Sequence, residues 1–88
     1  MSVQKSVTSL IRVAAEHGYH PTRFIKMWDA TPTISTLEKM VITGDIQTGF
    51  SKLAELGLLD YSVEKIVIDH SSNRSVIAAA KWRLDQVK

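Results

Sequence analysis

Apolar residues recur along the chain at intervals of three and four, which is the spacing of one face of an α-helix. The first segment shows this pattern over Val3, Val7, Leu10, Ile11 and Ala14. Gly18 then interrupts the pattern as a stop signal, and polar side chains occupy the other side of the segment. The pattern predicts an amphipathic surface helix that covers a core.

A second, shorter helix is predicted between the two prolines of the chain. Pro21 suits the first helical position, because its missing N–H would have no partner there. Phe24, Met27 and Trp28 then share one face, which we expect to point inward. The helix must end before Pro32, because proline disfavours helical geometry in the residue that precedes it.

Capping residues predict the third and fourth helices. Ser35 and Glu38 have the spacing of a capping box, with Thr33 as a competing cap, so a third helix should begin here. Asp45 is then expected to cap a fourth helix that ends at Gly57.

Two further helices are predicted in the C-terminal third. Asp60 is the expected cap of a fifth helix over the segment VEKIVID, which could also be a strand because it is rich in β-formers. We prefer a helix, because the chain has no second strand-like segment to pair with it. The cluster 71–73 should form a turn and cap the last helix, whose apolar stripe consists of Val76, Ile77, Ala80, Leu84 and Val87.

The predicted fold class is therefore all-α: a compact single-domain bundle of five or six short helices over residues 1–88. With 44% hydrophobic and 23% charged residues, the composition is that of an ordinary globular protein. A chain of 88 residues is expected to build a single core.

Charge and cysteine content narrow the range of functions. The chain has no cysteine, which excludes disulfides, thiolate nucleophiles and cysteine-ligated metals. The net charge of +2 comes from interspersed residues and gives little support for nucleic-acid binding. No apolar run is long enough for a membrane span, and the N-terminal residues lack the pattern of a signal peptide, so we expect a cytoplasmic protein without membrane contact.

We find no constellation of residues typical of an enzyme, a cofactor site or a metal site. His17, His20 and His70 have no nearby carboxylate at a known ligand spacing, and surface or capping roles suit them. Asp60 and Glu64 are four residues apart, but cap and helix-dipole roles account for both. We therefore expect no enzymatic activity, no cofactor and no metal.

Trp82 is the candidate binding residue. In a helix it falls on the side opposite the apolar stripe of the last segment, which predicts an exposed indole. Exposed tryptophans are enriched at binding hot spots, and Lys81 and Arg83 flank this one. The alternative is a terminal helix that is buried on two sides.

Residues 14–28 suggest an alternative function, because they resemble a helix-turn-helix. The spacing of Ala14 and Gly18, a short turn and a second helix fit that motif, in which the second helix enters the major groove of DNA. Thr22, Arg23 and Lys26 would then face DNA. The fit is partial, since His17 and the proline-containing turn occupy positions where apolar residues are common.

From Tyr19 onwards the chain resembles a group of uncharacterised small helical proteins of bacteria and their mobile elements. The shared elements are Gly49-Phe50, Leu53, Gly57-Leu58-Leu59-Asp60, Ser62-Val63-Glu64 and Arg83-Leu84. The chain departs from the group at Leu58, where a basic residue is frequent, and in a shortened turn before the last helix. The resemblance implies a helical domain and no known activity.

These observations together predict a small non-enzymatic binding or adaptor protein that docks on a protein or nucleoprotein partner, in a phage, plasmid or host-defence setting. A DNA-binding regulator that uses residues 14–28 is the alternative. An uncovered apolar face on so small a domain would also favour self-association.

Overall fold

The computed structural model describes residues 2–43 and 47–86. These residues form six α-helices and one short 3-10 helix, and they contain no strand. The elements are α1 (Val3–Glu16), α2 (Thr22–Ala30), α3 (Ile34–Thr43), α4 (Gln47–Glu55), η1 (Leu59–Tyr61), α5 (Val63–His70) and α6 (Arg74–Gln86). The predicted all-α bundle is confirmed.

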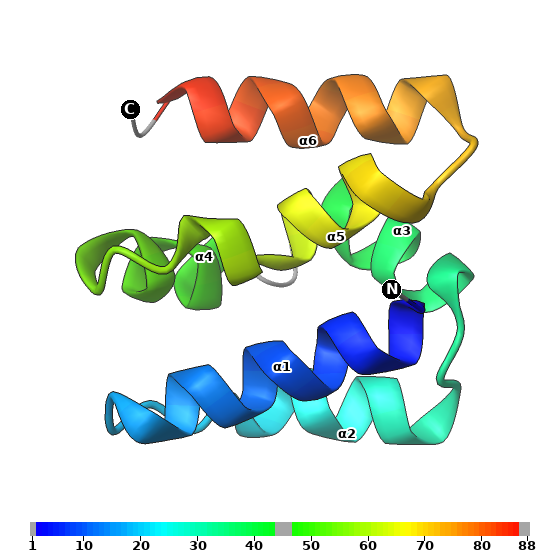
Figure 1. The fold of residues 1–88 in the computed structure, drawn as a ribbon. Helices are drawn as coiled ribbons and strands as arrows, with labels where there is room; N and C mark the ends of the chain where they lie inside the picture. Colours follow the sequence, from blue (N-terminus) through cyan, green and yellow to red (C-terminus); the bar gives the residue numbers. More distant parts are fainter. Residues whose placement is uncertain (1, 44–46, 87–88) are drawn as a thin grey trace.

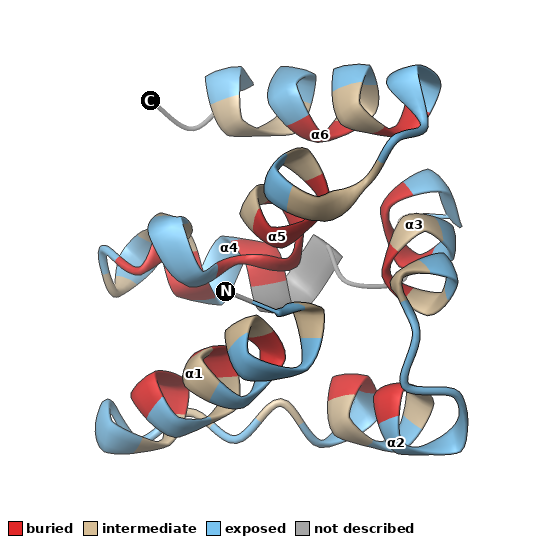
Figure 2. Cartoon of the chain, turned by 45° about the vertical axis from the view of Figure 1, so that its right-hand side comes forward, coloured by how far each residue is buried: buried red, intermediate tan, exposed pale blue. Residues whose placement is uncertain are grey.

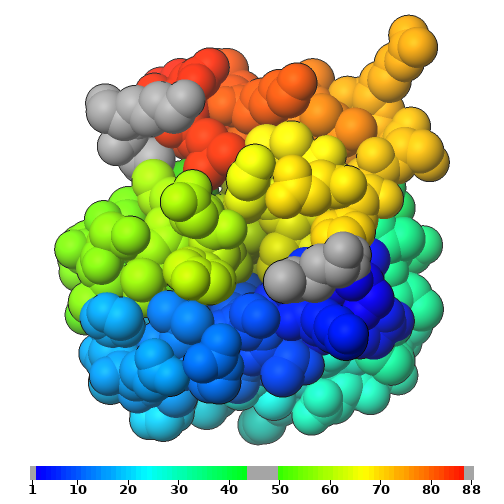
Figure 3. All heavy atoms as spheres, in the orientation of Figure 1, coloured from blue at the N-terminus to red at the C-terminus, as the bar shows by residue number. Residues whose placement is uncertain are grey.

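Helix α5 lies in the middle of the molecule. Figure 1 shows α1 and α2 together at one end, α6 at the opposite end, and α5 between them. Helix α5 contacts α6, α3 and α1, and in the space-filling view α6 (orange to red) lies directly on α5 (yellow) (Figure 3). The first turns of α5 are accordingly buried on several sides.

One apolar cluster joins the helices. The buried residues lie on the sides of the helices that face one another, as the red segments of Figure 2 show, and α5 contributes Val63, Ile66 and Val67 to the cluster. The radius of gyration of 11.6 Å matches the value of about 12 Å expected for a compact globule of this length.

The predicted ends of α1 and α2 agree closely with the structure. Helix α1 ends at Glu16, and Gly18 follows with a φ of +78°, a conformation that side chains with a Cβ rarely adopt. Helix α2 begins at Thr22, with Pro21 directly before it as the cap residue. Phe24 and Trp28 are buried as predicted.

The capping box predicted for Ser35 and Glu38 is wrong. Helix α3 begins at Ile34, so Ser35 lies inside its first turn and Thr33 directly precedes the helix. The Glu38 carboxylate instead accepts a hydrogen bond from the Ser71 hydroxyl, which ties α3 to the end of α5. The predicted cap Asp45 lies outside the described residues.

The helical prediction for VEKIVID is confirmed, but its cap is not Asp60. The Ser62 Oγ accepts a hydrogen bond from the backbone N–H of Lys65 at 3.2 Å, and Asp60 lies in the preceding 3-10 turn. Gly57 closes α4 with a φ of +72°. Asn73 caps α6 as the cluster 71–73 suggested, since its Oδ1 accepts from the N–H groups of Ser75 and Val76.

In the described part of the chain, no helix combines the length and the apolar character that crossing a membrane requires.

Candidate functional site

Trp82 lies on the outer face of α6 and is 64% exposed, which confirms its predicted exposure. The opposite face of α6 buries Val76 and Ala80 against the core. Because Val76 and Ala80 are four residues apart and Trp82 is two residues beyond Ala80, the indole must project away from the packed side of the helix.

Lys81, which precedes Trp82, is also exposed. Within residues 2–43 and 47–86 its amino group has neither a hydrogen bond nor an ion pair. We call the exposed side of α6 that carries Trp82 and Lys81 the outer face of α6.

Arg83 was predicted to flank Trp82 on this surface, but the structure places its charged group elsewhere. Its side chain is only 19% exposed and turns toward α5 and α3. The Arg83 Nη1 donates to Glu64 Oε2 at 3.1 Å, and Nη2 donates to the backbone carbonyl of Val41. Arg83 thus joins three helices by hydrogen bonds.

Glu64, the partner of Arg83, has no exposed surface. Its second oxygen, Oε1, is buried and finds no hydrogen-bond partner among the described residues. Burial raises the pKa of Glu64 above its ordinary value, and hydrogen bonding and the Arg83 charge oppose this only in part. The pair is a structural anchor for α6 and leaves no carboxylate there for chemistry with a ligand.

The sequence contained a signal for this anchor. Arg83 follows Val76 and Ala80 at intervals of seven and three residues, and Glu64 precedes Val67 by three. Both charged residues therefore occupy positions on the buried faces of their helices. A charge on each of two apolar stripes is typical of a buried ion pair.

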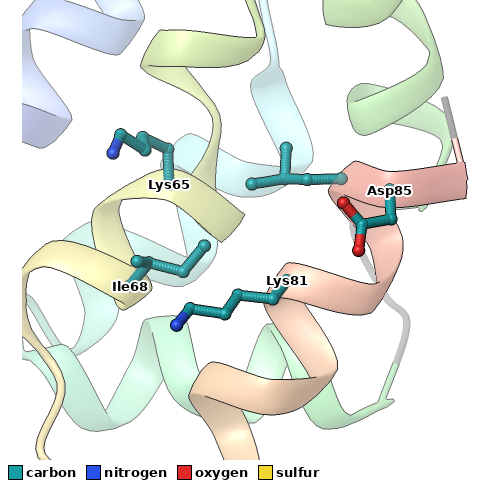
Figure 4. A pocket seen from close by; sticks show the side chains of 5 residues that line it. Lys65, Ile68, Lys81 and Asp85 are labelled. Atoms are coloured by element: carbon teal, nitrogen blue, oxygen red, sulfur yellow. The ribbon is translucent and has the colours of Figure 1, made fainter. Parts of the chain in front are cut away.

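A shallow hollow of about 290 Å³ lies between α5 and α6, next to Lys81. It is lined by Lys65, Ile68, Lys81, Leu84 and Asp85. Figure 4 shows the amino groups of Lys65 and Lys81 at one end of the hollow, on either side of Ile68, and Asp85 at the other end. Lys65 also forms an ion pair with Asp69 at 3.3 Å.

The residues of the alternative DNA-binding surface are on α2. Thr22, Arg23 and Lys26 are all exposed, on the side away from the buried Phe24 and Trp28. Residues 17–21 connect α1 to α2, which is longer than the three- to four-residue turn of a helix-turn-helix. In this connection His17 Nδ1 lies 3.0 Å from the Val13 carbonyl, which gives it the capping role expected from the sequence.

One serine–histidine contact was not foreseen. Ser6 Oγ of α1 and His70 Nε2 of α5 lie 3.2 Å apart although 64 residues separate them in the chain. Ser6 is an ordinary helical residue whose N–H donates to the Ser2 carbonyl, and among the described residues no carboxylate forms a hydrogen bond or ion pair with His70. The contact therefore ties α1 to α5 and lacks the third group of a catalytic triad.

The described residues contain no cluster of three or more histidine and carboxylate side chains that could hold a metal ion. Asp60 is exposed in η1, whereas Glu64 is buried and bound to Arg83, so the two carboxylates have different surroundings. His20 is exposed.

Comparison of the chain with models of protein families, with curated proteins and with solved structures finds no match in any of the three. The geometry of the outer face of α6 is therefore the ground for a functional proposal.

Proposed function

We propose that the chain is a non-enzymatic binding module that docks on a protein or nucleoprotein partner through the outer face of α6. The observation that supports this is the 64% exposure of Trp82 in a chain whose other tryptophan, Trp28, is only 7% exposed. Tryptophan is among the residues that carry most of the binding energy in protein interfaces.

The energetic argument concerns the indole surface that water now covers. A partner that covers about 150 Å² of the Trp82 side chain would gain up to about 4 kcal/mol from burial. A single residue of this kind can dominate a small interface. The ammonium group of Lys81, which has no ion pair among the described residues, adds a charge that can set orientation and partner choice.

Affinity capture with the purified, tagged chain from its native cell tests this proposal. The Trp82→Ala variant should lose the captured partner, with binding weakened by about 2 kcal/mol or more. Lys26→Ala, an exposed lysine on α2, is the matched control and should capture the partner as before. Equal capture by wild type and the Trp82→Ala variant would show that the outer face of α6 is the wrong surface.

A second candidate function is DNA binding through α2. The observation that favours it is the shared exposure of Thr22, Arg23 and Lys26 on one side of this helix. Fluorescence anisotropy with duplex DNA at ~50 and ~200 mM salt tests it, because phosphate contacts make affinity depend on salt. DNA binding should fall steeply with salt and be lost in the Arg23→Ala/Lys26→Ala double variant. Absent or salt-independent binding would exclude this function.

A further inference from the structure

We propose that the docking partner presents an acidic peptide segment, with one apolar side chain that enters the hollow between α5 and α6 and a neighbouring carboxylate that pairs with Lys81. This inference rests on the proposed docking function of α6 and specifies the chemistry of the partner. The hollow and Trp82 belong to the same helix, because Lys81 directly precedes Trp82 in α6 and lines the hollow.

The size and lining of the hollow indicate a side chain as its occupant. A volume of about 290 Å³ lies at the lower limit of pockets that hold whole small molecules. Ile68 and Leu84 supply apolar lining surface, and the hollow is open to solvent. It can therefore accept one aliphatic or aromatic side chain from a segment that lies along α6.

The charge of the hollow indicates that the segment is acidic. A partner side chain that covers Ile68 also removes water from the nearby amino group of Lys81, which has no ion pair in the described part of the chain. Removing water from an unpaired ammonium group is costly, and a carboxylate from the partner offsets this cost. Lys65 lies at the same end of the hollow and adds to the attraction, although Asp69 partly neutralises it.

The same surroundings disfavour a nucleic-acid strand on this surface. Asp85 lines the far end of the hollow and Asp69 lies beside Lys65 at the near end, so a run of phosphates along the hollow would meet a carboxylate at both ends. A peptide can place its single carboxylate at the lysine end and its apolar side chain in the hollow.

A library of random dodecapeptides displayed on phage, selected against the immobilised full chain, tests the inference. The selected peptides should be enriched in Asp or Glu within a few positions of an aliphatic or aromatic residue. A synthetic peptide from the selection should bind at least tenfold more weakly to the Lys81→Glu variant. Lys26→Glu, which makes the same charge reversal on α2, should bind the peptide like wild type.

The two indole N–H signals in an NMR titration locate the peptide. The signal of the exposed Trp82 should shift on addition of the peptide, and that of the buried Trp28 should not. Selected peptides without acidic enrichment, or binding that Lys81→Glu leaves unchanged, would overturn the acidic partner. If such peptides still required Trp82 for binding, the proposed docking function would remain, but its partner would not be acidic. A selection that yields no Trp82-dependent peptide would overturn this inference, and unchanged capture by Trp82→Ala from the native cell would overturn the docking function itself.

Discussion

Helices α2 and α6 each carry one tryptophan, which is buried in α2 and exposed in α6. Trp28 points from α2 into the core and is 7% exposed, whereas Trp82 points from α6 into solvent and is 64% exposed. The two helices lie at opposite ends of the bundle (Figure 1). The same residue type is thus structural at one end and available for contacts at the other.

The difference shows that α6 is held in place by other means than large apolar side chains. Its fully buried residues are Val76 and Ala80, which are small, and its remaining anchor is the hydrogen-bonded pair of Arg83 and Glu64. Helix α2 buries Phe24 and Trp28 instead. Helix α6 can therefore present its largest side chain to a partner without losing its own packing.

The largest expected effect comes from making the same substitution in both helices. Trp28→Ala should lower the free energy of unfolding by about 3–5 kcal/mol, because it removes a buried aromatic side chain and leaves a cavity. Trp82→Ala should change it by no more than about 0.5 kcal/mol, because the indole lies mostly in water. Urea denaturation followed by circular dichroism measures both. Similar losses in the two variants would show that Trp82 is also a packing residue.

The second prediction concerns the anchor of α6. Arg83→Ala should lower the free energy of unfolding by about 3 kcal/mol, because it leaves the Glu64 carboxylate buried without a partner. Lys81→Ala, at an exposed position two residues earlier in the same helix, is the matched control and should cost no more than about 0.5 kcal/mol. A cost below about 1 kcal/mol for Arg83→Ala would mean that the apolar contacts of α6, such as those of Val76 and Ala80, hold the helix without the ion pair.

The third prediction concerns Glu64, the partner of Arg83, and how the free energy of unfolding depends on pH. Because burial raises the pKa of Glu64 above its ordinary value of 4.5, the folded chain binds this proton more tightly than the unfolded chain. The contribution of Glu64 to stability is therefore fully present below pH 4.5 and declines as the pH rises through the raised pKa.

Glu64→Gln isolates this contribution, because glutamine keeps an oxygen that accepts from Arg83 but does not titrate. The stability of the variant relative to wild type should increase between pH 4 and pH 7, with a net cost smaller than that of Arg83→Ala. Urea denaturation at several pH values gives the difference curve, from which the shared titrations of all other groups cancel. A flat curve would show that Glu64 titrates alike in both states.

Periodicity predicted the helices and the exposed position of Trp82, because both depend on spacing within one segment. It failed where a choice depended on contacts between segments. Asp60 and Ser62 are both good cap residues two positions apart, and the 3-10 turn over Leu59–Tyr61 leaves Ser62 as the residue that precedes α5. The contacts of Ser6 with His70 and of Glu38 with Ser71 join distant parts of the chain, and no local pattern indicates them.

The anchor was missed for a different reason. Arg83 lies beside Trp82 in the chain, and this adjacency predicts a charge on the same surface, although helical spacing places Arg83 with Val76 and Ala80. Its long side chain reaches Glu64 and the Val41 carbonyl from that position. A charged residue that is spaced with the apolar residues of a helix therefore indicates an ion pair on the buried face rather than a charge on the exposed face.

The smallest effect concerns how the two helices begin. Asn73 Oδ1 accepts from two N–H groups at the start of α6, whereas the residue before α2, Pro21, makes no side-chain cap. Asn73→Ala should lower the free energy of unfolding by about 1 kcal/mol, and Asn73→Asp, which keeps an acceptor oxygen, should restore most of it. Thr22→Ala at the start of α2 should cost no more than about 0.5 kcal/mol.

Hydrogen exchange should show faster opening of the first turn of α6 in Asn73→Ala, with α2 unchanged. If α2 opened to the same extent, the two ends of the bundle would unfold as one unit, and the two helices would not differ in how independently they are held.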